Sequence, residues 1–358
     1  MNFELSDEQL LLQATVRQFL ERECPAERRR ALFEAEQGFD PVLWKGMLEL
    51  GLGGIHLAEE HGGVGLELLD LALVAEELGR HAAPGPFLGH ALAGLAVAAG
   101  GSEAQRRRWL PKLATGAALG TVALAEAGDA WLPEDWTLSG GDVLAGTKLH
   151  VPCADAADLI VVGVAGGGLA VVEREAGGVA IEPEDGADRS RRLARVRLEG
   201  ARAEPLASDP GAAARVRDAG LVLLAADAWG GASRCVELAV EHAKTRRQFG
   251  VPIGSFQALK HQLANLAVEV EPVRALVWWA AHAFDRAPAE AERAAALAKA
   301  HATDRFMQVA RDTVEAHGGI GFTWECDVQL FFKRALFDRA WLGTPGRHRE
   351  RTAVLAGW

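Results

Sequence analysis

Residues 315–325 read Glu-Ala-His-Gly-Gly-Ile-Gly-Phe-Thr-Trp-Glu and directly follow an apolar-periodic run, Phe306 to Val314. Glycine has no Cβ, so a stretch this rich in glycine can let the backbone approach a ligand phosphate or another chain. Taken alone, such a stretch is more often an ordinary helix stop. It gains meaning beside a second stretch, Thr-Arg-Arg-Gln-Phe-Gly at residues 245–250. We expect the rest of the chain to bring these two stretches together.

The composition limits the class of protein. The chain has 358 residues, of which 49% are hydrophobic, enough for two or three domains. A formal net charge of -11 argues against a nucleic-acid binder, which would carry a basic face. The four cysteines form no CxxC pair, which favours buried thiols over disulfides or a metal site. With neither a signal peptide nor an apolar run long enough for a bilayer, we expect a cytoplasmic protein without a membrane partner.

The first part of the chain, residues 1–117, is predicted to be a helical domain. Ser6 is expected to cap the first helix, and Gln9, at the third helical position, to complete a capping box. A buried stripe should run along this helix from Leu10 to Leu20. Further amphipathic helices are predicted over residues 43–50, 68–78, 88–98 and 105–113.

The residue pattern changes in the middle of the chain from helical to strand-like, and then becomes helical again. Residues 118–209 hold short apolar runs between glycine, aspartate and proline, which predicts an antiparallel β domain. From residue 210 to residue 358 the helical period returns, so a C-terminal helical domain is expected. The fold class is therefore α+β. The predicted strands lie near residues 121–124, 159–162, 169–172 and 196–198, and the predicted helices span residues 213–244, 256–279, 289–316 and 326–342.

This order of parts, together with the two quoted stretches, resembles the acyl-CoA dehydrogenase family over essentially the whole chain. Other matching segments are Leu-Ser-Asp-Glu-Gln at residues 5–9, Leu-Gly-Leu-Gly-Gly-Ile at 50–55, Glu-Glu-His-Gly-Gly-Val-Gly-Leu at 59–66 and Glu-Glu-Leu-Gly-Arg at 76–80. The resemblance implies an N-terminal helical domain, a middle β-barrel-like domain and a C-terminal four-helix bundle. It also implies FAD and the α,β-dehydrogenation of an acyl-CoA thioester, in which a glutamate removes the α-proton and flavin N5 accepts the β-hydride.

In this family each FAD is shared between subunits, and the resemblance assigns an adenine and pyrophosphate site here. Arg246 matches an arginine that contacts the pyrophosphate across the interface, a role that suits a guanidinium fork. Phe249 matches an aromatic residue beside the adenine, although core packing is an equally good interpretation. Glu315 stands where glutamine is usual, which removes an amide donor, and His317 is interpreted as a structural residue. The cofactor-binding candidates are Arg246, Gln248, Phe249, Ile253, Phe256, Gln257, Glu315, Gly318 and Gly319.

The positions that meet the flavin ring in the family have changed. Ala125 stands in place of a threonine whose side chain meets the ring. Pro152 stands in place of another threonine, which removes both a hydroxyl and a backbone donor. The resemblance therefore assigns the adenine side of a flavin site to this chain, but not the ring side.

The catalytic base is also missing by this comparison. Its usual position, just before a Gly-Thr pair, is occupied by Leu342, and its alternative position on the long helix falls on Gly220. Neither residue can take a proton. Asp218 and Asp227 lie near Gly220 on the same predicted helix, but an interhelix or surface role is the favoured interpretation of both.

The replaced positions all belong to the flavin-ring site or to the catalytic base, and they lead to one hypothesis. The chain resembles the degenerate partner in heteromeric family members that act on bulky steroid-like side chains. We expect a non-catalytic subunit of an α2β2 acyl-CoA dehydrogenase, with an acyl-CoA substrate, a related catalytic subunit and electron-transfer flavoprotein as partners. Three alternatives stay open: a self-sufficient homo-oligomer with a relocated base, a non-enzymatic scaffold that kept the fold, and a flavin oxygenase that needs no glutamate.

Overall fold

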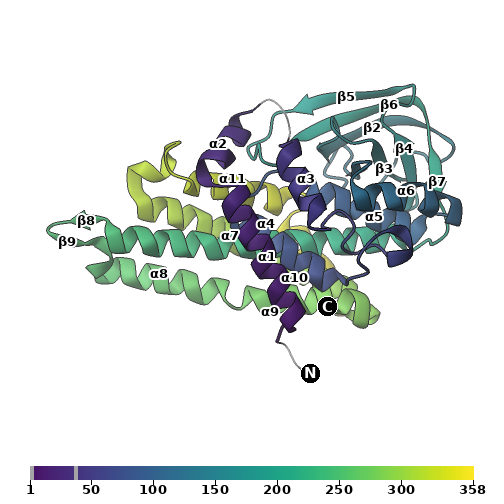
Figure 1. Cartoon of the computed structure of the whole chain (residues 1–358). Helices are drawn as coiled ribbons and strands as arrows, with labels where there is room; N and C mark the ends of the chain where they lie inside the picture. The colour runs from purple at the N-terminus through teal and green to yellow at the C-terminus, as the bar shows by residue number, and fades with distance from the viewer. Residues whose placement is uncertain (1–3, 36–38) are drawn as a thin grey trace.

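The computed structural model describes residues 4–35 and 39–358. Helices come first, strands follow, and helices return at the end, so the predicted α+β class is confirmed (Figure 1). The N-terminal helices cover one side of the long helices of the C-terminal part. They are α1 (Asp7–Glu23), α2 (Ala26–Glu34), α3 (Pro41–Glu49), η1 (Glu59–His61), α4 (Leu68–Arg80), α5 (Phe87–Gly100) and α6 (Glu103–Thr115).

The start of α1 follows the sequence prediction, but its buried face does not. The Ser6 hydroxyl accepts from the Gln9 backbone, and the Gln9 side chain accepts from the Ser6 backbone, which confirms the capping box. Leu10 is 52% exposed, so its predicted burial is wrong. Only the second half of α1 is buried, through Val16, Phe19 and Leu20. The stripe therefore begins later than the sequence period indicates.

The strands form two facing sheets. In the middle part of the chain the two sheets have the strand orders β1-β3-β4-β7 and β2-β6-β5, and the Ala125–Leu149 bridge joins their edges, which gives this part its barrel-like character. The prediction of a wholly antiparallel domain is wrong, because β1 and β3 pair in parallel. The chain passes through β2 in the other sheet between them and returns in the same direction. The strands are β1 (Gly120–Ala123), β2 (Val143–Pro152), β3 (Leu159–Val164), β4 (Gly168–Glu173), β5 (Val179–Glu184), β6 (Leu193–Arg202) and β7 (Glu204–Leu206).

The C-terminal helices form the expected bundle with one break and one addition. The helix predicted over residues 256–279 divides at Glu271–Pro272, because proline lacks the N–H that would continue the backbone ladder. A short helix after Thr344 was not predicted. No described helix is long and apolar enough to cross a membrane. The elements are α7 (Ala212–Thr245), β8 (Arg247–Gln248), β9 (Val251–Pro252), η2 (Ile253–Ser255), α8 (Gln257–Val270), α9 (Val273–Arg286), α10 (Pro288–His317), η3 (Gly318–Phe322), α11 (Val328–Ala340) and α12 (Pro345–Leu355).

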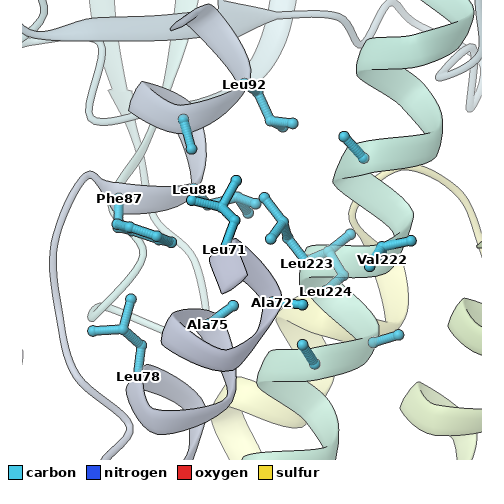
Figure 2. Packing of buried hydrophobic residues seen from close by; sticks show 14 of the residues in the cluster. Leu71, Ala72, Ala75, Leu78, Phe87, Leu88, Leu92, Val222, Leu223 and Leu224 are labelled. Atoms are coloured by element: carbon cyan, nitrogen blue, oxygen red, sulfur yellow. The ribbon is translucent and has the colours of Figure 1, made fainter. Parts of the chain in front are cut away.

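The main core joins the N-terminal helices to α7. Figure 2 shows side chains of α4 and α5 meeting those of α7, among them Leu71, Leu92 and Leu223. Glycines let α4 and α7 approach closely, since a Cβ at Gly79 would lie 2.0 Å from the Asp227 carbonyl oxygen. The long helix is thus fixed against the rest of the molecule, and the residues at its end are held in place.

Candidate functional site

Residues 245–250 and residues 315–325 lie at the same end of the helical bundle. α7 ends at Thr245, the first residue of one stretch, and α10 ends at His317, within the other. The imidazoles of His242 and His317 stack with their centroids 4.3 Å apart, which joins the two helix ends. In Figure 1 the β8–β9 hairpin projects from this end of α7, away from the sheets. The expectation that the fold brings the two stretches together is therefore met.

The hairpin holds Phe249 out in solvent. Phe249 (φ 52°) and Gly250 (φ 82°) both have positive φ, as a two-residue hairpin turn with the right twist requires. The Phe249 ring is 91% exposed, so the core interpretation of this residue is wrong. Its only aromatic neighbour among the described residues is Phe256, edge-on at 6.0 Å. The pair forms an exposed aromatic surface at the tip of the bundle.

Arg246 combines a fixed backbone with a free side chain. Its N–H donates to the His242 carbonyl and its own carbonyl accepts from Ile253, both at 2.8 Å. Across the part of the chain that the structure describes, its exposed guanidinium makes no hydrogen bond or ion pair. A guanidinium held on a rigid backbone without a carboxylate partner suits a diphosphate.

The other adenine-side candidates surround this arginine, with one exception. Gln248 and Gln257 are exposed near the hairpin, and Glu315 is exposed at the end of α10. A Cβ added at Gly318 or Gly319 would meet nothing within 4 Å, so the loop leaves open space for a close approach. Ile253 is the exception, because it is half-buried against the bundle core. These exposed polar side chains and the open glycine loop leave this end of the bundle accessible to a ligand.

The two predicted base positions are in contact with each other. A Cβ built on Gly220 would lie 2.5 Å from Leu342 Cδ1 and 3.3 Å from Leu92 Cδ1. Leu342 is fully buried. The place that either base would reach is thus filled by leucine side chains, and glycine is needed at position 220 to make room for them.

The loop that carries Leu342 is held by two buried basic residues that the sequence argument missed. Lys299 Nζ donates to the Asp338 carbonyl at 2.5 Å and to the Gly343 carbonyl at 3.2 Å, while His348 Nε2 bonds the Leu342 carbonyl at 2.8 Å. Burial lowers the pKa of Lys299 to about 7 and that of His348 to about 4. Both side chains bind backbone carbonyls and thereby fix the loop. Lys299 comes from α10, far from the loop in the sequence, and His348 lies on a helix that the sequence pattern does not predict, so no local pattern marks either residue.

The two aspartates near Gly220 belong to ion pairs. Asp218 Oδ1 accepts from Arg217 Nε at 2.8 Å, and burial raises the pKa of Asp218. Asp227 is buried between Arg191 and Arg334. Neither carboxylate bonds to the loop at Leu342, and the structure agrees with the interhelix interpretation.

At the positions that meet the flavin ring in the family, the hydrogen-bonding groups bond to other residues of this chain. The Ala125 carbonyl accepts from the Leu149 N–H at 2.9 Å, and the His150 carbonyl accepts from Trp341 Nε1 at 3.0 Å. Trp131 stacks on His150 at 5.6 Å and meets Trp341 edge-on at 6.0 Å. A cavity of about 600 Å³ opens beside these aromatic rings. At the positions taken from the family, backbone acceptors are occupied and hydroxyls are absent, so the residues do not fit an isoalloxazine ring held in the family's way.

Metal ligation has no counterpart among residues 4–35 and 39–358. No described group of three or more His, Cys, Asp or Glu could hold a metal ion. The four cysteines are free thiols, of which Cys24, Cys153 and Cys235 are buried and Cys326 is half-buried.

Comparison with known sequences agrees with the fold. The description "Acyl-CoA dehydrogenase, N-terminal domain" matches residues 6–117, and "Acyl-CoA dehydrogenase, C-terminal domain" matches residues 218–354. Acyl-CoA dehydrogenase IpdE2 of Mycolicibacterium smegmatis is 37% identical over 348 residues, which is 97% of this chain and 98% of that relative. The likeness thus extends over all three parts of the fold.

Solved structures show the same likeness in three dimensions. The structure described as "Tcur3481-Tcur3483 steroid ACAD G363A variant" superposes with a TM-score of 0.90 at 32% identity and covers 98% of each chain. An acyl-CoA dehydrogenase of Bacillus anthracis complexed with FAD gives a TM-score of 0.88 at 25% identity, over 99% of this chain and 68% of that one. Sequence, fold and the two signature stretches agree, and the chain belongs to the acyl-CoA dehydrogenase family.

Proposed function

We propose that this chain is the non-catalytic subunit of a heteromeric FAD-dependent acyl-CoA dehydrogenase, assembled as α2β2. The observation that carries the proposal is the contact between Gly220 and Leu342, where a Cβ at Gly220 would lie 2.5 Å from the leucine methyl. Dehydrogenation requires a group that takes the α-proton. Because both family positions for that group meet in one apolar contact, the base must come from a related partner subunit.

The contribution of this chain is the adenine and pyrophosphate side of the cofactor. The free guanidinium of Arg246 and the open glycine loop at Gly318 and Gly319 support this assignment. FAD, when bound, supplies the acceptor for the hydride from the β-carbon. The similar structure named for two proteins and called a steroid ACAD supports a heteromer and a bulky steroid-like acyl-CoA. Electron-transfer flavoprotein is the proposed electron acceptor.

The flavin content of purified protein tests the proposal. The chain expressed alone is expected to carry no stoichiometric FAD and to oxidise no acyl-CoA, while co-expression with a related catalytic chain gives a yellow, active complex. The readouts are flavin absorbance per chain and reduction of an artificial acceptor. One FAD per chain together with acyl-CoA oxidation by this chain alone would sink the proposal.

A substitution in the assembled complex tests whether this chain holds the adenine and pyrophosphate side of FAD. Arg246→Ala should lower FAD occupancy, because it removes a charge-assisted contact worth about 1.5–3 kcal/mol, which corresponds to roughly a 10- to 150-fold weaker FAD affinity. Arg274→Ala is the matched control, since Arg274 lies on α9, where it pairs with Glu271 and lies over the Trp278 ring. Equal FAD affinity in both variants would place the pyrophosphate elsewhere.

A further inference from the structure

Two stacked histidines, one just before residues 245–250 and one within residues 315–325, are given no ligand-binding role by the family resemblance. His242 lies in the last turn of α7, and His317 is the last residue of α10. Their rings are 4.3 Å apart and inclined by 26°, and both side chains are half-buried. Arg246 follows His242 by one helical turn, its N–H bonded to the His242 carbonyl. The two rings thus lie at the helix ends next to the backbone of Arg246 and the loop that begins at Gly318.

The hydrogen bonds of the pair show which atom can take a proton. His317 Nδ1 lies 2.8 Å from the Thr313 carbonyl, which can only accept, so Nδ1 carries the hydrogen. The Nε2 atom of His317 is then the basic nitrogen of the neutral ring. Protonation at Nε2 would turn the ring into a cation without disturbing its bond to α10.

The surroundings of His242 disfavour its cation when no ligand is present. Burial, followed by the charges of His317 and Arg246, lowers the pKa of His242. Within the described ranges no carboxylate forms an ion pair with either ring. The acids on the same helices are engaged elsewhere or turned outward: Glu241 pairs with Arg234, Asp312 pairs with Arg311, and Glu315 is exposed without an ion pair in the described part of the chain.

A diphosphate would reverse this balance. Its negative charge beside Arg246 favours the protonated form of a neighbouring imidazole, and the protonated ring in turn becomes a charge-assisted donor. Stacked rings disfavour two adjacent positive charges, so one added proton is the expected number. We propose that His242 and His317 join Arg246 in binding the diphosphate of an adenine dinucleotide, and that the pair takes up one proton as the diphosphate binds. The inference rests on the proposed function, which assigns the adenine side of FAD to this surface.

ADP-ribose is the probe that isolates this step. It carries the adenosine and the diphosphate diester of FAD without the flavin ring, and the charge of a diester does not change near neutral pH. Calorimetric titration of the full chain in two buffers of different ionisation enthalpy measures proton uptake directly. We expect uptake approaching one proton and an affinity that falls by up to about tenfold per pH unit between about pH 6 and about pH 8.

Variants locate the proton and distinguish the two proposals. His242→Gln and His317→Gln should each reduce the proton uptake and flatten the pH dependence. His301→Gln is the control, because His301 lies earlier on α10 and burial also lowers its pKa. This variant should change neither the proton uptake nor the pH dependence. Binding of ADP-ribose without proton uptake, and with equal affinity at both ends of the pH range, overturns the histidine inference alone. Absence of ADP-ribose binding to the chain at every pH overturns this inference, while the flavin content of the co-expressed complex decides the proposed function separately. The calorimetry on the unsubstituted chain decides the matter even where a variant fails to fold.

Discussion

Leu342 has a backbone conformation that leucine rarely adopts. Its φ of 59° lies in the left-handed region, which costs on the order of 1 kcal/mol for a residue with a Cβ. The surrounding residues stabilise it: His348 bonds the Leu342 carbonyl and Lys299 bonds the next one. Glycine at position 220 completes the arrangement by leaving space for the leucine methyl groups. Residues from three helices therefore specify an apolar plug at the family's base position.

Gly220→Ala should destabilise the chain through this plug. Inserting a methyl group into a filled core costs about 1–3 kcal/mol, partly offset by about 1 kcal/mol from the better helix propensity of alanine. Leu342→Ala removes the clash, so the double variant should be more stable than the sum of the single effects by about 1 kcal/mol or more. Urea unfolding of the four proteins measures this coupling. Simple additivity would mean that the two residues do not contact in solution.

Asp218 is the residue on which a relocated base would depend. Its carboxylate is bonded to Arg217, which also lies 3.4 Å from Glu292 of α10. We therefore expect Asp218→Asn to leave the turnover of the assembled complex within about threefold, a change below 1 kcal/mol in the activation barrier. Steady-state oxidation of acyl-CoA measures it, with Asp218→Ala as a check on folding. Loss of turnover with unchanged FAD content would instead favour a self-sufficient enzyme.

At the scale of elements, the sequence predicts those whose burial has a regular period. α7 and α10 are long and rich in small apolar residues, and both lie within two residues of their predicted bounds. α2 and α12 escape prediction because they are mostly polar and bury only Phe33, or Pro345 and His348. The sequence pattern does not reveal the break at Pro272, because the apolar period continues across it. The parallel pairing of β1 with β3 arises because the chain passes through the other sheet between them. No local sequence pattern encodes that path.

A buried ion pair joins the segment after β1 to β2. Lys148 Nζ is 2.7 Å from Glu126 Oε1, and Thr137 and Leu138 donate to the same carboxylate. Burial alone would raise the pKa of Glu126, but Lys148 and the donors of Thr137 and Leu138 lower it to about 2. The ordinary pKa of this carboxyl is 4.5. The stability that this difference supplies is present above about pH 4.5 and is lost as the pH falls towards about 2.

Glu126→Gln should cost about 3 kcal/mol near neutral pH, since a pKa difference of about 2.5 is worth that much. The difference from the unsubstituted chain should shrink as the pH falls from about 4.5 to about 3. Urea unfolding across this range measures it. Glu182→Gln is the control in the same domain, because Glu182 pairs with Arg197 at 3.4 Å in an exposed setting. A constant difference at all pH values would show that lost packing, not charge, is responsible.

At the scale of the whole molecule, the sequence located the candidate site better than it described it. The stretches at residues 245–250 and 315–325 stand out in the sequence, but the hairpin that the first one forms was not predicted. The stacking of His242 on His317 and the contact of Gly220 with Leu342 join residues far apart in the chain. Such contacts arise from the packing of α7 against α10 and the final loop. A single sequence does not contain that information.

One buried cluster holds all three parts of the fold together. Arg334 of α11 donates to Asp188 at 2.8 Å and to Asp227 of α7 at 3.0 Å. It also donates to the Ala83 carbonyl before α5 at 2.8 Å. Arg191 pairs with the same Asp227. Burial, and then the charge of Asp227, raise the pKa of Asp338 next to them.

Arg334→Met should therefore destabilise the whole chain and not α11 alone. Removing one partner of a buried ion pair leaves the other charges uncompensated, at a cost of about 3–5 kcal/mol. Arg339→Met is the matched control on the same helix, because Arg339 pairs with Asp304 at a half-exposed site and should cost under about 1 kcal/mol. Urea unfolding followed by circular dichroism and by tryptophan fluorescence measures both variants. We expect one lowered midpoint for Arg334→Met with the two signals coincident, since the cluster joins every part. Equal small losses in the two variants would mean that the cluster does not hold the parts together.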